Sequence, residues 1–266
     1  MSRLDKKFAT LNAAGRKALI PFITAGDPSL EATVPVMHAL VAAGADVLEL
    51  GVPFSDPMAD GPTIQRSSER ALARGAGMSW VLEAVRTFRQ GDDDTPVVLM
   101  GYLNPVEIRG ADDFARDAAA AGVDGVLLVD LPPEESSGFR AAFAAHGVDL
   151  ILLASPTTPD ARLSLLLGNA QGYLYYVSFA GVTGASERLD PAAAAAHLRR
   201  IRADSPVPVV AGFGIRDAAS AAAMAVDADG VVVGSALVSA MAGAVDAGEA
   251  AALAAAFLAP LRAAVD

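Results

Sequence analysis

Short apolar segments alternate along the chain with longer, alanine-rich segments that favour helix. The short segments are almost continuous runs of apolar residues, which is typical of strands buried on both faces of a sheet. Their positions predict strands at residues 18–24, 46–50, 96–101, 124–130, 149–154, 173–178, 207–212 and 230–234. Because a helical segment follows each strand, we expect the strands to form a parallel sheet.

Eight strand–helix units within 266 residues match the size of a (β/α)8 TIM barrel. We therefore predict an α/β fold in which residues 1–266 form a single domain. An extra helix is expected at the N-terminus, over residues 2–14, because Leu4, Phe8 and Leu11 share one helical face.

The helix after the first strand is expected to open at Asp27 and Pro28 and to run to about residue 43. Pro35 conflicts with a regular helix interior, because proline lacks the N–H that the helix ladder needs. Either Thr33 caps a later start, with Pro35 in the first turn, or the helix is kinked.

A short pattern of small residues and an aspartate recurs before three predicted strands, at residues 43–47, 121–125 and 227–231. Gly44 and Gly122 suit the position just after a helix end. Asp46, Asp124 and Asp229 then fall at strand starts, which lie on the face of a barrel that serves stability. We assign these aspartates no catalytic role.

Composition narrows the classes of function. The net charge is 20 − 31 = −11, which argues against a nucleic-acid surface. The chain has no cysteine, so neither a disulfide nor thiolate chemistry is available. The longest uncharged stretch, residues 163–186, is interrupted by polar residues, so we expect no membrane span and a cytoplasmic protein.

The clearest candidate chemistry lies in residues 49–63. Glu49 stands at the end of an apolar strand, where a buried carboxylate is costly unless it has a partner or a function. The loop that follows contains three prolines and two further carboxylates, Asp56 and Asp60. Catalytic side chains of these barrels lie at the C-terminal ends of the strands, which is where this loop begins.

The remaining strand ends predict an apolar pocket that binds phosphate. Their residues are mostly apolar or aromatic, which suits a hydrophobic ring better than a sugar; they are Phe22, Thr24, Met100, Tyr102, Leu127, Val129, Leu153 and Tyr175. Glycine clusters at residues 212–215 and 234–236 follow the last two strands, where backbone N–H groups of such barrels bind phosphate. The glycine-rich residues 178–186 are a candidate lid.

Two mechanisms are not expected. The three lysines lie within the first 17 residues, so none is placed to form a Schiff base at a strand end. The histidines fall in predicted helices and form no cluster with carboxylates, which argues against a metal site; they are His38, His146 and His197. What remains is acid–base chemistry by carboxylates on a phosphorylated, largely apolar substrate.

The chain resembles the tryptophan synthase alpha subunit family in five segments that occur in the same order, at residues 21–28 (PFITAGDP), 49–65, 181–184, 212–215 and 234–236. The resemblance implies a TIM barrel that cleaves indole-3-glycerol phosphate to indole and glyceraldehyde 3-phosphate in tryptophan biosynthesis. It implies no cofactor in this chain. It also implies a beta subunit that holds pyridoxal phosphate and receives indole through a tunnel, in an alpha2-beta2 heterotetramer.

The resemblance further implies roles for single residues. Glu49 would be the general acid–base, and Asp60 would face the indole N–H. The implied substrate-binding residues are Phe22, Met100, Leu127, Tyr175 and Phe213 around the ring and side chain, Gly184, Gly214, Gly234 and Ser235 at the phosphate, and Thr183 between lid and Asp60. The implied partner-facing residues are Asp56 and the prolines near it, with Asn104 and Pro132, and no metal ligand is implied.

One position departs from the family pattern. Many members carry arginine where this chain has Phe179, which cannot make a charged contact, so lid ordering is expected to differ. Three other functions stay open: a stand-alone lyase that releases indole, a non-catalytic barrel that binds a phosphometabolite and regulates a partner, and a phosphosugar isomerase. The presence of both Glu49 and Asp60 favours an enzyme.

Overall fold

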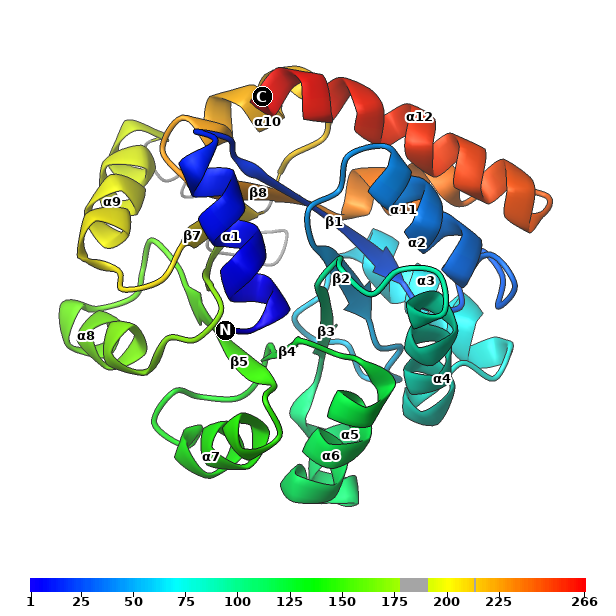
Figure 1. Ribbon diagram of the computed structural model, residues 1–266, viewed down its shortest axis with the longest axis horizontal. Coiled ribbons are helices and arrows are strands. Elements are labelled where there is room, and N and C mark those ends of the chain that lie inside the picture. Colours follow the sequence, from blue (N-terminus) through cyan, green and yellow to red (C-terminus); the bar gives the residue numbers. More distant parts are fainter. Residues whose placement is uncertain (178–190, 213) are drawn as a thin grey trace.

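A computed structural model describes residues 1–177, 191–212 and 214–266, and its strands close into a parallel barrel (Figure 1). The strands pair in chain order and β8 returns to β1. They are β1 (Ala18–Thr24), β2 (Leu48–Gly51), β3 (Val97–Gly101), β4 (Gly125–Leu128), β5 (Asp149–Ala154), β6 (Leu174–Val177), β7 (Val209–Gly212) and β8 (Gly230–Val233). All eight predicted strands are present, and the predicted (β/α)8 fold is confirmed.

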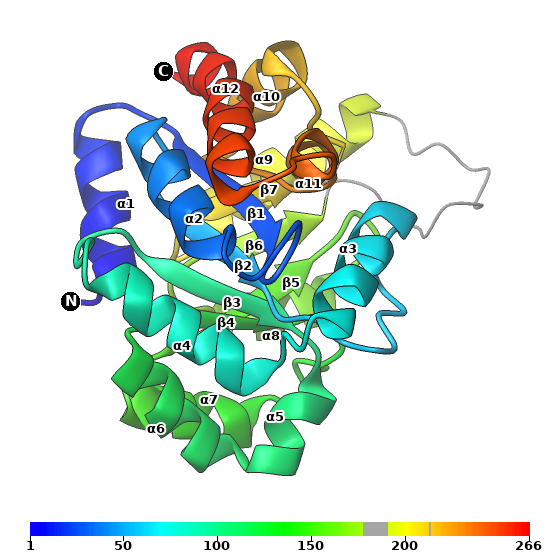
Figure 2. The ribbon, with the colours of Figure 1, turned by 90° about the vertical axis from the view of Figure 1, so that its right-hand side faces the viewer.

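Helices surround the barrel (Figures 1 and 2). They are α1 (Arg3–Ala13), α2 (Thr33–Ala42), α3 (Pro62–Ala73), α4 (Met78–Arg89), α5 (Leu103–Arg109), α6 (Ala111–Ala121), α7 (Ser137–Ala145), α8 (Asp160–Asn169), α9 (Pro191–Asp204), α10 (Ala218–Ala225), α11 (Ser235–Met241) and α12 (Ala247–Val265). In Figure 2 the strands point to the right, with α1 at their N-terminal ends and α3 beside their C-terminal ends.

The predicted N-terminal helix is confirmed as α1, and it covers the N-terminal opening of the barrel. Leu4, Phe8 and Leu11 are buried and join the apolar cluster inside the barrel. A second apolar cluster fills the layer between the strands and the surrounding helices. Burial of both strand faces explains why the strands read as continuous apolar runs.

Among the described helices, α12 alone is long and apolar enough to cross a membrane by length and composition. It packs against α2 and α10 (Figure 1), and it buries Ala250, Ala254 and Leu258. Packing against these helices accounts for the apolar residues that α12 buries.

The expected start of the second helix at Asp27 and Pro28 is wrong, and the alternative of a later start with Pro35 in the first turn is confirmed, because α2 begins at Thr33. Thr33 is not the cap, however: the N-cap residue is Ala32, and the Thr33 hydroxyl accepts a hydrogen bond from the N–H of Gly26 at 2.9 Å. The carboxylate of Asp27 instead pairs with an arginine of α3, a long-range contact that local sequence does not reveal.

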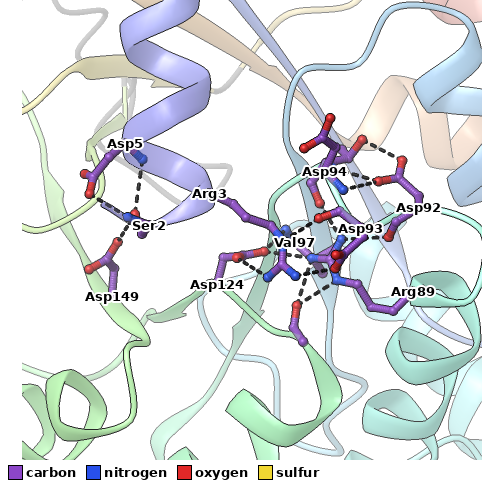
Figure 3. Close-up of polar contacts among 12 residues, drawn as sticks. Ser2, Arg3, Asp5, Arg89, Asp92, Asp93, Asp94, Val97, Asp124 and Asp149 are labelled. Atoms are coloured by element: carbon purple, nitrogen blue, oxygen red, sulfur yellow. Dashed lines mark hydrogen bonds and ion pairs between the residues drawn. The ribbon is translucent and has the colours of Figure 1, made fainter.

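The N-terminal face carries the recurring aspartates in a shared arrangement, shown for Asp124 in Figure 3. Asp124 precedes β4 and accepts a hydrogen bond from the N–H of Val97, the first residue of β3, at 2.9 Å. Arg89 of α4 and Arg3 of α1 donate to the same carboxylate at 2.7 and 3.1 Å. Asp124 thus connects both α4 and α1 to the N-terminal end of the barrel.

Asp46 and Asp229 repeat this arrangement. Each accepts from the N–H of the first or second residue of the preceding strand at 2.9 Å and from an arginine at 2.7 Å; the arginines are Arg262 and Arg202. At Gly122 a Cβ would lie 2.8 Å from Cγ of Arg89, so glycine both ends α6 and lets the arginine pass. The repeated pattern is a structural device, as expected.

Candidate active site

Glu49 lies in β2 with its side chain inside the barrel and is fully buried. The hydroxyl of Tyr173 donates a hydrogen bond to Glu49 Oε1 at 2.6 Å, while Oε2 has no partner among the described residues. Burial raises the pKa of Glu49 to about 7, and the Tyr173 hydrogen bond opposes that rise. A carboxyl group with this pKa can both give and take a proton near neutral pH.

Asp60 lies at the end of the loop after β2, directly before Gly61 and α3. Burial raises its pKa to about 6, and a hydrogen bond from Tyr102 partly opposes the rise. The Tyr102 hydroxyl also accepts from the N–H of Ala59 at 3.0 Å, and Gln65 Nε2 donates to the Asp60 carbonyl at 2.8 Å. Both the backbone and the side chain of Asp60 are therefore held in place.

A cavity of about 310 Å³ at the C-terminal end of the barrel brings the two carboxyl groups together. Its described lining residues are Phe22, Glu49, Ala59, Asp60, Gly61, Ile64, Met100, Tyr175, Gly214, Ile215, Arg216, Val232, Gly234, Ser235 and Ala236. The volume suits a small ligand, and the lining combines apolar side chains with few polar groups. Eight of the residues expected at the site are thus neighbours in space.

The remaining expected residues lie elsewhere. Leu127 is fully buried within the barrel and is not among the described residues that line the cavity. The positions of Thr183, Gly184 and Phe213, like Phe179 and the candidate lid, fall outside the described residues. Partner-facing roles were expected for residues in loops or helix starts that follow β2, β3 and β4; these are Asp56, Asn104 and Pro132.

Two glycines near strand ends, Gly214 and Gly234, are among the residues that line the cavity. Gly214 follows β7, and Gly234 is the N-cap residue of α11, which starts at Ser235. A Cβ on Gly234 would lie 3.4 Å from Phe22, in ordinary contact, so a larger side chain would project toward the ligand space. Backbone N–H groups in such a setting can bind an anion, with Arg216 as a nearby cation.

The histidines lie away from this cavity. His38 packs on Phe88, His146 ends α7 beside Asp112, and His197 lies next to Tyr176. Within the described ranges no group of three histidine, aspartate or glutamate side chains could hold a metal ion.

Two tyrosines of the site were not predicted as site residues. Tyr173 lies two residues before Tyr175, so the two side chains share one strand face, and this spacing was the available signal. Tyr102 was noted at a strand end, but nothing local linked it to Asp60, 42 positions earlier. A tyrosine in an apolar strand is usually interpreted as a core residue. Only the folded structure shows which group its hydroxyl contacts.

Comparisons with known proteins identify the family of this chain. The family model described as tryptophan synthase alpha chain matches residues 8–264. The tryptophan synthase alpha chain of Xanthomonas oryzae pv. oryzae (strain PXO99A) is 72% identical over 266 residues, which cover 100% of this chain and 99% of the relative. That of Xanthomonas campestris pv. campestris (strain B100) is 69% identical, covering 99% of this chain and 97% of the relative.

Solved structures of tryptophan synthase have the same fold as this chain. Tryptophan synthase subunit alpha from Legionella pneumophila str. Paris matches with a TM-score of 0.93 and 48% identity, covering 100% of this chain and 99% of that one. A tryptophan synthase structure from M. tuberculosis in its aminoacrylate-bound form matches with a TM-score of 0.88 and 38% identity over 100% of both chains. The chain therefore belongs to the tryptophan synthase alpha chain family, the carbon–carbon lyases that cleave indole-3-glycerol phosphate in tryptophan biosynthesis.

Proposed function

We propose that this chain cleaves indole-3-glycerol phosphate with Glu49 as the proton carrier and Asp60 as the carboxylate that stabilises the indole ring. The observation that supports this most directly is that both carboxyl groups, with raised pKa values, line one largely apolar cavity. Alpha chains of this family carry no cofactor, and pyridoxal phosphate belongs to the beta subunit. The protein's own side chains must therefore supply the chemistry.

In this proposal protonated Glu49 first donates a proton to indole C3, which becomes tetrahedral and leaves a cation at N1. The Glu49 carboxylate then removes the proton of the glycerol hydroxyl. The C–C bond breaks, its electrons return to the ring, and indole and an aldehyde form. Glu49 ends protonated, so one group with a pKa of about 7 serves both steps.

Asp60 acts through its charge. With a pKa of about 6 it is ionised at neutral pH, and a carboxylate near N1 stabilises the cation that develops there. Tyr102 supports this role, because its hydrogen bond favours the ionised form of Asp60. The interaction strengthens as charge appears in the ring, so it accelerates the reaction more than it tightens binding.

The substrate would lie with its ring against apolar side chains and its phosphate on backbone N–H groups. Phe22, Met100, Tyr175 and Ile64 supply apolar lining, and Gly214, Gly234 and Ser235 supply backbone N–H groups to the same cavity. By family resemblance we also assign Leu127 and Phe213 to the ring, Gly184 to the phosphate and Thr183 to the contact between lid and Asp60.

Membership of the family implies a beta-subunit partner. We further propose an alpha2-beta2 assembly in the cytoplasm, with residues 1–266 as one domain and with Asp56, Asn104 and Pro132 facing the beta subunit. The exposure of Asp56 and Asn104 near the cavity end of the barrel supports this surface. The absence of cysteine is compatible with a reducing compartment.

The test is the rate of indole release from indole-3-glycerol phosphate by the wild type and by Asp60→Asn. The variant keeps the shape of the side chain and removes its charge, so kcat should fall by about 10²–10³ while KM changes a few-fold. Glu107→Gln, which removes an exposed carboxylate on α5, is the control and should leave both constants unchanged. If KM rose while kcat stayed constant, Asp60 would be a binding residue only.

A further inference from the structure

An ion pair outside the cavity connects β1, the strand that pairs with the Glu49 strand β2, to α3, the helix that Asp60 directly precedes. Asp27 follows β1 and its side chain is 2% exposed; Arg70 lies on α3 and donates to both carboxylate oxygens, at 2.7 and 2.8 Å. A two-pronged contact of this kind fixes distance and orientation together. No substrate contact is assigned to either residue, so the pair has no role in the chemistry itself.

Two further contacts hold α3 and the segment after it against the end of β1. The hydroxyls of Ser67 and Thr24 lie 2.6 Å apart in a buried position, and Ser67 is itself fixed by donating to the carbonyl of Ile64 within α3 at 2.8 Å. Gly26 has φ +88°, and a Cβ there would lie 2.6 Å from Cβ of Ala76, so the loop after β1 touches the segment that follows α3. The helix is thus attached to β1 from Ser67 onward.

The other end of α3 enters the cavity. Asp60 and Gly61 directly precede the helix, and Ile64 in its first turn lines the cavity with them. Gln65 holds the carbonyl of Asp60 at 2.8 Å. The position of Asp60 therefore depends on where α3 lies.

β1 also determines where Glu49 lies, because Phe22 of β1 is paired in register with Glu49 of β2. A continuous path runs from Glu49 through β1 and the Asp27–Arg70 pair to α3 and Asp60. The Arg70 side chain is 36% exposed, so the pair contributes modest net stability, and its advantage is the defined geometry of a two-pronged contact. That advantage matters where two catalytic groups come from different elements.

We propose that Asp27 and Arg70 are positioning residues for the lyase reaction: their ion pair holds α3 on the end of β1 so that Asp60 faces the cavity that Glu49 also lines. The inference rests on the role of Asp60 proposed above. Loss of the paired geometry should displace Asp60 and slow the reaction, while Gly214 and Gly234, which lie on other elements, keep their places.

Arg70→Lys tests this, because lysine keeps the charge and loses the fork that matches a carboxylate. We expect kcat for indole release to fall about tenfold or more, since small displacements of reacting groups are costly, with KM for indole-3-glycerol phosphate within about threefold. Asp27→Glu keeps the negative charge but lengthens the side chain, so it should also lower kcat for indole release. Arg89→Lys is the matched control: it alters the buried pair with Asp124 at the opposite end and should lower stability without lowering kcat per folded molecule.

The decisive comparison repeats Arg70→Lys in the Asp60→Asn background. If the pair acts through Asp60, the double variant should be no slower than Asp60→Asn alone. An equal loss in both backgrounds, an unchanged kcat for Arg70→Lys, or an equal loss of kcat for Arg89→Lys would each overturn the proposal. Full activity of Asp60→Asn would instead remove the proposed role of Asp60, a result distinct from failure of the ion pair.

Discussion

The two ends of the barrel both hold buried or half-buried carboxyl groups, but the groups around them differ. At the N-terminal end Asp46, Asp124 and Asp229 each accept a backbone N–H and at least one arginine. At the C-terminal end Glu49 accepts a hydrogen bond from the hydroxyl of Tyr173, and Asp60 accepts one from the hydroxyl of Tyr102. No arginine or lysine in the described part of the chain forms an ion pair with either of these two.

This difference distinguishes carboxylates that are paired with arginine and stabilise the fold from carboxyl groups that can gain and lose a proton near neutral pH. Burial raises the pKa of Asp124 as well, but a backbone N–H and two arginines oppose it, whereas at Glu49 only the Tyr173 hydroxyl does. Groups without a cation keep a proton at higher pH, which is what general acid–base catalysis needs. The lack of an ion pair at Glu49 therefore fits the proton-carrying role proposed for it.

The largest expected effect is on catalysis at the C-terminal end. Glu49→Gln should slow indole release by roughly 10²–10⁴, because glutamine cannot carry the proton, and substrate binding should change only a few-fold. The measurement is kcat with the binding constant of indole-3-glycerol phosphate. Asp124→Asn at the opposite end should leave kcat per folded molecule unchanged, and a comparable loss there would erase the distinction between the two ends.

The second effect is on stability at the N-terminal end. Asp124→Ala should lower the free energy of unfolding by about 3–5 kcal/mol, because Arg89 and the N–H of Val97 lose a buried partner. Urea unfolding measures the change. Asp113→Ala, which removes the exposed pair with Arg116 on α6, should cost far less. Similar costs at both sites would mean that the buried pair is no more important than a surface one.

The third effect is the pH dependence of stability contributed by Glu49. The raised pKa means that the folded state holds a proton that the unfolded state releases, so stability falls as pH rises from 4.5 to about 7 and then levels off. Glu49→Gln removes this loss, so it should stabilise the protein by roughly 3 kcal/mol at pH 8 and hardly at all below pH 4.5. Unfolding across this range is the measurement, and a stability difference independent of pH would contradict the raised pKa.

The smallest effect concerns Tyr102. Tyr102→Phe removes the hydrogen bond that favours ionised Asp60, so the pKa of Asp60 should rise above 6 and the acidic limb of the kcat profile should move up by about one pH unit or less. Activity should fall several-fold near pH 6 and little at pH 8. Tyr176→Phe, on the outer side beside His197, is the control and should leave the profile in place.

Much of the fold could be predicted because its causes are local. Strands buried on both faces are apolar along most of their length, and glycine commonly follows a helix end, so the eight strand–helix units could be recognised before any contact was known. The start of α2 was not, because Asp27 looked like a helix opening and is held by an arginine 43 positions away. Strand ends also shifted by a few residues, since pairing with neighbours decides them.

The residues of the site likewise divide into those that local sequence indicates and those that only the fold brings together. Glu49 and the glycine clusters stood out because a carboxylate in an apolar strand and repeated glycines at strand ends are unusual in their own segments. Tyr173 reaches Glu49 across 124 positions and Arg262 reaches Asp46 across 216, so no local pattern could indicate these partners. Side-chain type and spacing are properties of the chain, whereas burial and the identity of a distant hydrogen-bond partner arise only when the barrel closes. The pKa values that separate the catalytic end from the structural end depend on those two properties, so the tertiary structure alone decided them.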